Sequence, residues 1–307
     1  MKIISNSVTE INERDPFKKI ELVGRTCYKS ESNITKDSAK KFVSRLIKSK
    51  HLAMTEHAVF TFCLPSYLLE ADYANRVNIN RFMTISKLTE EESKPCLEHS
   101  SIIVSANLRS IIESYGLLKS AMINILNESY PELVEIISEG ITSSDNCCGY
   151  MINDVSMIPE SARSAHSFKT FRFITDRGVS HELVRHRDAS FGQESTRYCL
   201  YSSDKFGNEL TFIRPSTWNL MNSKAQTVLT NSFRDAESAY MELVANGLNA
   251  QQARAVLPNS IKTEIVVTAS EQEWHHIGDL RYRGTTGAPH PDMRDLMSKL
   301  HEIYPEL

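Results

Sequence analysis

The sequence predicts an α+β fold, and three observations support this class. The chain has 307 residues and is 41% hydrophobic, which is enough for a sizeable buried core. Apolar residues recur at helical spacing over most of its length, and a few short β-branched or aromatic runs are interleaved among these helical patterns. The length suits one large domain or two ordinary ones, and we expect a single domain over residues 1–307.

Helices are predicted where one face of the pattern is apolar. The first covers residues 35–50, with Thr35 as the expected N-cap and with Phe42, Val43 and Leu46 on the apolar face. The other predicted helices cover residues 105–115, 117–127, a segment that opens at 129, 176–187, 223–246, 271–282 and 292–303.

Strands are predicted at residues 59–62, 168–173, 211–215 and 263–268, where β-branched and aromatic side chains are concentrated. Residues 140–155 are rich in Ser, Asp, Asn and Gly and are expected to form a loop. Between about 64 and 165 helical patterns dominate, so this stretch is predicted to be a helical insertion.

Composition excludes several classes of protein. A net charge of −3 disfavours a general nucleic-acid binder, and the absence of a long apolar run near the N-terminus predicts neither a signal peptide nor a membrane span. The six cysteines follow no zinc spacing, so no metal site is expected and reduced thiols in a cytoplasmic protein are the simple interpretation. They are Cys27, Cys63, Cys96, Cys147, Cys148 and Cys199. The neighbouring His275 and His276 would point about 100° apart on a helix, which makes a poor chelate.

The densest polar stretch is residues 185–198. It contains three arginines, a histidine, the glutamine Gln193, three serine or threonine hydroxyls and a tyrosine. Guanidinium groups match phosphate and carboxylate oxygens, while hydroxyls and an amide can bind the neutral polar edge of a base or a flavin. Glu182, Arg185 and His186 are neighbours within one helical turn and should reach the helix end together. A solvated, charged helix end followed by a loop is the alternative.

This stretch resembles the signature of the flavin-dependent thymidylate synthases. Arg185-His186-Arg187 is followed after seven residues by Ser195, and Arg197-Tyr198 comes next. Three further blocks resemble that family in the same order. They are His51 to His57 before an aromatic strand, Ala253-Arg254 to Pro258 before another strand, and Trp274 to Arg281.

The resemblance implies a fold and a reaction. The fold would be a central, mostly antiparallel sheet flanked by helices. The enzyme would be a methyltransferase of nucleotide biosynthesis that makes dTMP from dUMP. It would take its carbon from 5,10-methylenetetrahydrofolate and its electrons from NADPH through FAD. It would act as a homotetramer whose sites are shared between subunits, with no nucleic acid or membrane as partner.

The resemblance also implies site residues. FAD would be contacted by His51, Glu56, Arg185, His186, Arg187, Ser270 and His276. The substrate dUMP would be held by Glu182, Gln193, Ser195, Arg197, Arg254 and Arg281. Arg281 and Ser195 are the catalytic candidates. For Arg281 the reason is that positive charge beside the uracil ring stabilises the anion that develops there. Arg197 and Arg254 are the expected phosphate ligands.

Several positions depart from the family pattern. Glu182 stands where a glutamine often contacts dUMP, and its carboxylate would repel the phosphate, so we expect it to pair with an arginine. Gly192 replaces a larger polar residue and Gln193 replaces a glutamate. Ser270 and His276 stand where asparagines often occur.

Alternatives remain for the whole chain and for two residues. A flavin or nucleotide binder of the same fold without turnover is the alternative to an enzyme. A hydrolase acting through Ser195 would lack a nucleophile elbow. Glu264 is expected to be a paired structural charge, and a structural role for His57 is slightly favoured.

Overall fold

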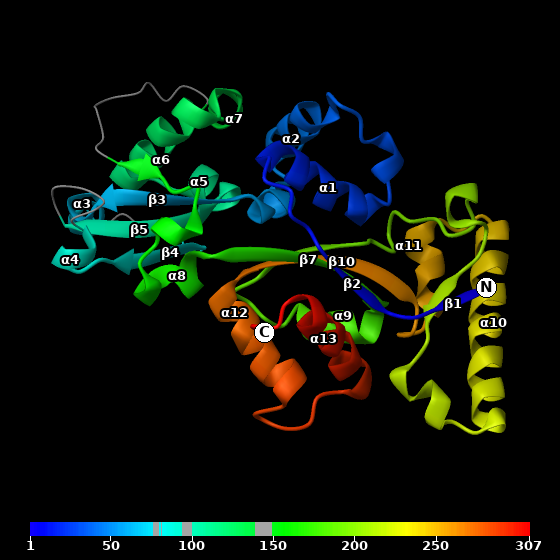
Figure 1. Cartoon of the computed structure of the whole chain (residues 1–307). Helices are drawn as coiled ribbons and strands as arrows, with labels where there is room; N and C mark the ends of the chain where they lie inside the picture. The colour runs from blue at the N-terminus through cyan, green and yellow to red at the C-terminus, as the bar shows by residue number, and fades with distance from the viewer. Residues whose placement is uncertain (76–79, 81, 94–99, 139–148) are drawn as a thin grey trace.

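The computed structural model describes residues 1–75, 80, 82–93, 100–138 and 149–307. Their strands form two four-stranded antiparallel sheets and one two-stranded parallel pair (Figure 1). Helices cover the sheets. The prediction of an α+β fold with antiparallel sheets flanked by helices is therefore confirmed.

The first sheet has the strand order β2-β7-β10-β8. Its strands are β2 (Ser7–Glu10), β7 (Phe168–Asp176), β10 (Lys262–Ser270) and β8 (Ser190–Gln193). Every pair is antiparallel, and Val267 lies between Phe171 and Phe191. On one face, apolar side chains of β7 and β10 form a core around Trp274 with three helices. These helices are α9 (Arg177–Leu183), α12 (Glu271–Gly278) and α13 (Pro291–Ile303).

Helix α1 (Pro16–Tyr28) packs near β8 and β10, on the side of the first sheet that Figure 1 shows opposite to α12 and α13. Its start follows from local chemistry. The carboxylate of Asp15 accepts hydrogen bonds from the backbone of Phe17 and Lys18, and Pro16 occupies the first turn, where its missing N–H costs nothing.

The second sheet has the strand order β4-β5-β3-β6. Its strands are β4 (Met83–Lys87), β5 (Ser101–Asn107), β3 (Val59–Pro65) and β6 (Tyr150–Met151). Its main core is shared with α2 (Ser38–Lys48), α3 (Ser66–Ala74), α5 (Leu108–Glu113), α6 (Gly116–Ser129) and α7 (Pro131–Ile137). Helix α8 (Glu160–His166) closes a smaller core, and α4 (Glu90–Ser93) is a single turn.

A third, smaller core joins the N-terminus to the segment after β8. Strand β1 (Lys2–Ile4) pairs in parallel with β9 (Thr211–Ile213), and the stacked rings of Phe212 and Phe233 anchor α10 (Ser223–Ala245). The short helix α11 (Ala250–Ala253) packs beside α10. The single turns are η1 (Glu31–Asn33), η2 (Leu52–His57), η3 (Val155–Met157), η4 (Asp204–Phe206), η5 (Ser216–Leu220), η6 (Arg254–Val256) and the π-turn η7 (Asp279–Arg283).

Most of the predicted elements are present, but several boundaries were wrong. Helix α2 begins at Ser38 rather than at the expected cap Thr35, whose backbone N–H instead donates to the hydroxyl of Ser38. Helix α9 ends at Leu183 instead of residue 187, and residues 190–193, where no strand was predicted, form β8. The predicted helix 271–282 leaves α-geometry at Gly278 and continues as the π-turn.

The prediction of a helical insertion was also wrong in part. Between residues 64 and 165 the described residues include strands β4, β5 and β6 as well as helices. Residues 105–107, predicted to start a helix, instead end β5, because the preceding Ile102, Ile103 and Val104 are fully buried between β3 and β4. Most of the predicted loop 140–155 lies outside the described residues, and β6 occupies 150–151. The single-domain organisation stays a prediction.

None of the helices in the described part of the chain is both long enough and apolar enough to span a membrane.

Candidate active site

A cavity of about 910 Å³ is lined by both four-stranded sheets. Four residues that the sequence predicts as cofactor contacts line it: Glu56, Arg187, Ser270 and His276. They come from η2, the turn after α9, the end of β10 and α12. The rest of the lining is Val59, Phe82, Thr84, Ser105, Asn107, Ala165, Phe168, Val184, Asp188, Ala189, Ser190, Phe191, Thr268, Gln272 and Glu273.

Helix α12 positions one wall of this cavity. The hydroxyl of Ser270 caps the helix by accepting a hydrogen bond from the backbone N–H of Glu273 at 3.2 Å. Glu273 and His276 then follow three residues apart, so both side chains lie on the same side of the helix. The ring of His276 packs edge-on against His186 with centroids 5.9 Å apart.

Glu56 forms an ion pair with Arg109 of α5, a helix that packs on the second sheet. Its carboxylate lies 2.7 Å from the guanidinium of Arg109 in α5, and Arg109 also bonds Glu113 at 2.9 Å. The two carboxylates hold the pKa of Arg109 above its usual range, so the guanidinium stays charged.

Arg281 lies in the π-turn after α12 and contacts α9. Its guanidinium lies 2.9 Å from the carboxylate of Glu182, and its Nε donates to Nε2 of His186 at 3.2 Å. The expectation that Glu182 pairs with an arginine is therefore confirmed. Because Nε2 of His186 accepts, a neutral ring carries its proton on Nδ1, which faces Glu273 at 3.6 Å. Glu182, His186, Arg281, Glu273 and His276 thus form one continuous polar cluster, in which Glu273 and His276 line the large cavity.

Gln193 is turned into the protein. Its amide nitrogen donates to the hydroxyls of Ser180 at 2.8 Å and Thr263 at 3.2 Å. Its neighbour Gly192 has no room for a side chain, since a Cβ there would lie 2.3 Å from Cγ1 of Val23 on α1. A glycine at this position therefore allows α1 to pack closely on β8.

The expected phosphate ligands lie in segments that share the third core, in which Cys199 and Ala253 are both buried. Ser195 donates its backbone N–H to the carbonyl of Cys27, and Arg197 stacks over the ring of Tyr198 at 5.4 Å. Arg254 begins η6 and, like Arg197, is exposed. Across the described ranges, neither guanidinium has an ion pair.

Three predicted cofactor residues lie outside the cavity lining. His51 is exposed at the start of η2, and Arg185 is exposed directly after α9. His186, between Arg185 and Arg187, is buried and contacts two residues of the lining, Glu273 and His276.

His57 and Glu264 are both buried and bonded to other residues of the fold. Nδ1 of His57 bonds the hydroxyl of Thr268, a cavity residue, at 2.8 Å, and full burial lowers the pKa of His57 to about 3. Burial opposes ionisation of Glu264, but Lys262 at 2.7 Å and Lys29 at 2.9 Å outweigh it and lower the pKa of Glu264 to about 2. Glu264 is thus a paired structural charge, as expected.

Sequence reasoning missed the wall that the second sheet supplies. Phe82, Thr84, Ser105 and Asn107 line the cavity from β4, β5 and the turn before β4. The signal that was available is the β-branched run Ile102-Ile103-Val104, which favours a strand that continues through residue 107.

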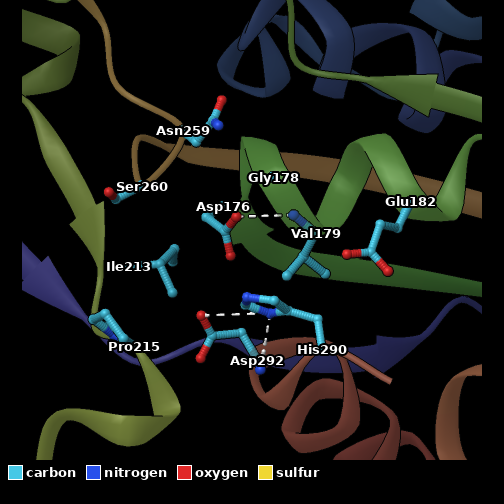
Figure 2. Close-up of a pocket in the computed structure, with 10 residues that line it drawn as sticks. All are labelled: Asp176, Gly178, Val179, Glu182, Ile213, Pro215, Asn259, Ser260, His290 and Asp292. Atoms are coloured by element: carbon cyan, nitrogen blue, oxygen red, sulfur yellow. Dashed lines mark hydrogen bonds and ion pairs between the residues drawn. The ribbon is translucent and has the colours of Figure 1, made fainter. Parts of the chain in front are cut away.

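A second cavity, of about 240 Å³, lies at the start of α9 (Figure 2). Asp176, Glu182 and Asp292 line it together with His290. Burial raises the pKa of Asp176, the hydrogen bond that Asp176 accepts from Val179 opposes the shift, and the charge of Asp292 adds to it. Such an acidic lining repels phosphate, so this cavity does not suit the phosphate end of a nucleotide.

Comparison with known proteins bears on both the site and the fold. The family model described as "Thymidylate synthase complementing protein" matches residues 9–87 and 159–306 and leaves residues 88–158 unmatched. A flavin-dependent thymidylate synthase of Geobacter sulfurreducens is 37% identical over 105 residues, which are 34% of this chain and 43% of that protein. One of Sulfurisphaera tokodaii is 32% identical over 117 residues, 38% of this chain and 43% of that protein. These alignments span less than half the length of either relative.

Among solved structures, a UMP/dUMP methylase PolB from Streptomyces cacaoi with bound 5-Br dUMP aligns with a TM-score of 0.40 and 14% identity, covering 100% of this chain and 93% of that one. The family model, in contrast, spans well over half of the chain. The chain therefore belongs to the thymidylate synthase complementing protein family, the family of the flavin-dependent thymidylate synthases.

Proposed function

We propose that this protein is a flavin-dependent thymidylate synthase that methylates dUMP to dTMP. In this proposal 5,10-methylenetetrahydrofolate supplies the carbon, and NADPH supplies the electrons through FAD. Family membership supports it. The observation that carries it is that Glu56, Arg187, Ser270 and His276 line one cavity, although they lie far apart in the sequence.

The residues of this cavity fit a flavin. Its volume of about 910 Å³ lies within the range of ligand-binding cavities, about 300–1,000 Å³. Arg187 offers positive charge for a pyrophosphate, and hydroxyl and imidazole groups of Ser270 and His276 can bind the polar edge of the ring. When bound, the flavin supplies hydride transfer, while the protein orients the ring and excludes water.

Arg281 is the residue we assign to uracil activation. Its guanidinium would lie beside the carbonyl groups of the pyrimidine and stabilise the negative charge that develops on the ring. The contacts to Glu182 and His186 fix the guanidinium before substrate arrives, so little reorganisation is needed. Through His186 it is joined to His276, which lines the large cavity.

Arg197 and Arg254 are assigned to the phosphate of dUMP, with Ser195 assisting. Both side chains are exposed and have no ion pair within the described residues, so their charges are available to an anion. The family also leads us to include a homotetramer with shared sites in the proposal. A cytoplasmic location belongs to the same proposal.

The test is release of tritium from dUMP labelled at uracil C5. Purified protein is incubated with FAD, NADPH, methylenetetrahydrofolate and labelled dUMP, and radioactivity in water is counted. Release that requires both FAD and folate supports the synthase. Absence of release while flavin is bound would favour the alternative, a flavin or nucleotide binder of the same fold without turnover.

A further inference from the structure

We propose that Asn107, a residue of the segment that the family model leaves unmatched, is a flavin-binding residue of the large cavity. In this assignment its amide N–H donates a hydrogen bond to an acceptor on the edge of the flavin ring. The inference rests on the proposed function and extends it. The second sheet then contributes to cofactor binding as well as to the core.

Asn107 is fixed in one orientation. It ends β5 and caps α5, because its Oδ1 accepts a hydrogen bond from the backbone N–H of Ser110 at 2.8 Å. Its carbonyl accepts from the Ser110 hydroxyl at 2.7 Å, and the next residue, Leu108, donates its N–H to Ala58 at 2.8 Å. The capping contact also settles which end of the amide is oxygen, since a backbone N–H needs an acceptor.

The amide nitrogen of Asn107 is left without a partner among the described residues. The residue is 6% exposed and lines the large cavity, and its amide nitrogen is not among the fully buried polar atoms that lack a partner, so a molecule in that space can reach it. A ligand that enters the cavity displaces water from this amide, and a polar group that loses water without gaining a hydrogen bond is unfavourable. A ligand in the cavity that carries an acceptor would satisfy it.

The neighbouring polar groups of β5 do not compete for this role. Ser105 lies two residues earlier and lines the same cavity. Its hydroxyl is already shared between Thr61 and His166, both at 2.8 Å. Asn107 is therefore a donor on β5 that remains available to a ligand.

A flavin ring matches this donor. The pyrimidine part of the isoalloxazine presents carbonyl oxygens and ring nitrogens that accept hydrogen bonds. Glu56, held by Arg109 of α5, and Ser270 of β10 line the same cavity, so a ring placed there would meet polar groups from both sheets.

The test compares two substitutions at Asn107 that keep the helix cap. Asn107→Ser and Asn107→Asp both retain a capping oxygen but lack the amide donor, and only the second adds a charge. Flavin-free protein is titrated with FAD, and the dissociation constant is taken from the quenching of flavin fluorescence. Loss of one hydrogen bond to the ligand should weaken binding by about tenfold in Asn107→Ser, and by more in Asn107→Asp.

Asn222→Asp is the matched control. Asn222 caps α10 through the same contact, from its Oδ1 to the backbone N–H of Ala225 at 2.9 Å, and it does not line the cavity. Its dissociation constant for FAD should equal that of the unaltered protein, and the unfolding temperatures of all variants should stay close together.

The outcomes separate this inference from the proposed function. Equal FAD affinity in the unaltered protein and Asn107→Ser would overturn the role of Asn107 and leave the function standing. Weakening only in Asn107→Asp would also overturn it, because added charge alone would explain the effect. Failure of the unaltered protein to bind FAD would overturn both.

Discussion

The guanidinium of Arg281 and the carboxylate of Glu182 lie 2.9 Å apart and join the π-turn after α12 to helix α9. Arg281 also donates to His186, so the one side chain that we assign to uracil activation is oriented by two residues of the α9 region. The pair is partly exposed, and Glu182 lines the smaller cavity at the start of α9. Glu182 therefore both positions Arg281 and places a negative charge near the expected substrate.

Replacing that charge should help substrate binding. In Glu182→Gln, an amide oxygen can still accept from Arg281, while the repulsion between a carboxylate and the phosphate of dUMP is gone. We expect the dUMP concentration at half-maximal rate to fall by about two- to fivefold, the scale of a partly exposed charge pair. Steady-state rates at varied dUMP measure this.

Asp279→Asn is the control for Glu182→Gln, because Asp279 pairs with Arg283 in the same π-turn and does not contact Arg281. It should leave the dUMP requirement unchanged. A rise in that requirement in Glu182→Gln would show that positioning of Arg281 outweighs the repulsion.

Arg281→Ala should keep the flavin and lose turnover. The guanidinium contributes to the charge that develops on uracil, and removal of one such donor typically lowers kcat by about 10²- to 10³-fold. Arg281→Lys keeps the charge but not the planar fork, so it should recover part of the rate. Flavin absorbance and tritium release, measured on the same preparations, separate cofactor loss from catalytic loss. Normal turnover in Arg281→Ala would remove this residue from the mechanism.

Arg197→Ala should raise the dUMP requirement far more than the NADPH requirement. Loss of a charge-assisted hydrogen bond to phosphate costs about 1.5–3 kcal/mol, or roughly 10- to 150-fold in the half-saturating dUMP concentration. Arg234→Ala, on the exposed side of α10, removes an equal charge as a control. Equal effects on both substrates would show that Arg197 does not bind the phosphate.

What the sequence predicted well has a physical explanation. The long amphipathic helix 223–246 and the β-branched run 263–268 have strong local signals, and both form nearly as predicted. The pairing of Glu182 with an arginine followed from charge alone, since a carboxylate among arginines has few other stable arrangements.

What the sequence did not predict depends on contacts that are distant in the chain. Asn107 ends a strand only because β5 pairs with β3 and β4, and the local pattern there also fits a helix. Helix α1 was not predicted, although Asp15-Pro16 is a typical helix start with an N-cap followed by proline in the first turn.

Gly192 makes a prediction about packing. A methyl group there would overlap Val23, so Gly192→Ala should lower the free energy of unfolding by about 1–3 kcal/mol. Val23→Ala opens the space. The double variant should therefore be less destabilised than the sum of the two single variants, by more than about 0.5 kcal/mol. Urea unfolding of the four proteins measures this cycle, and simple additivity would mean that the overlap is relieved elsewhere.

His57 makes a prediction about pH. Burial, with a smaller contribution from Lys19, lowers its pKa from 6.5 to about 3, so the ring stays neutral in the fold while the unfolded chain takes up a proton below pH 6.5. The unfolded state therefore binds more protons between those values, and stability falls as the pH drops through this window, by about 1.4 kcal/mol per pH unit.

His57→Asn keeps a polar group at the position of Nδ1, which bonds Thr268, and removes the titration. Between pH 7.5 and pH 5 the unaltered protein should lose about 2 kcal/mol more than His57→Asn in urea unfolding. His166, whose pKa burial lowers to about 4, contributes equally to both proteins and cancels, and pH 5 lies above the range in which Glu264 takes up a proton. Identical pH dependence in the two proteins would show that His57 is protonated in the folded protein. Its Nε2 would then need a hydrogen-bond acceptor inside the buried pocket.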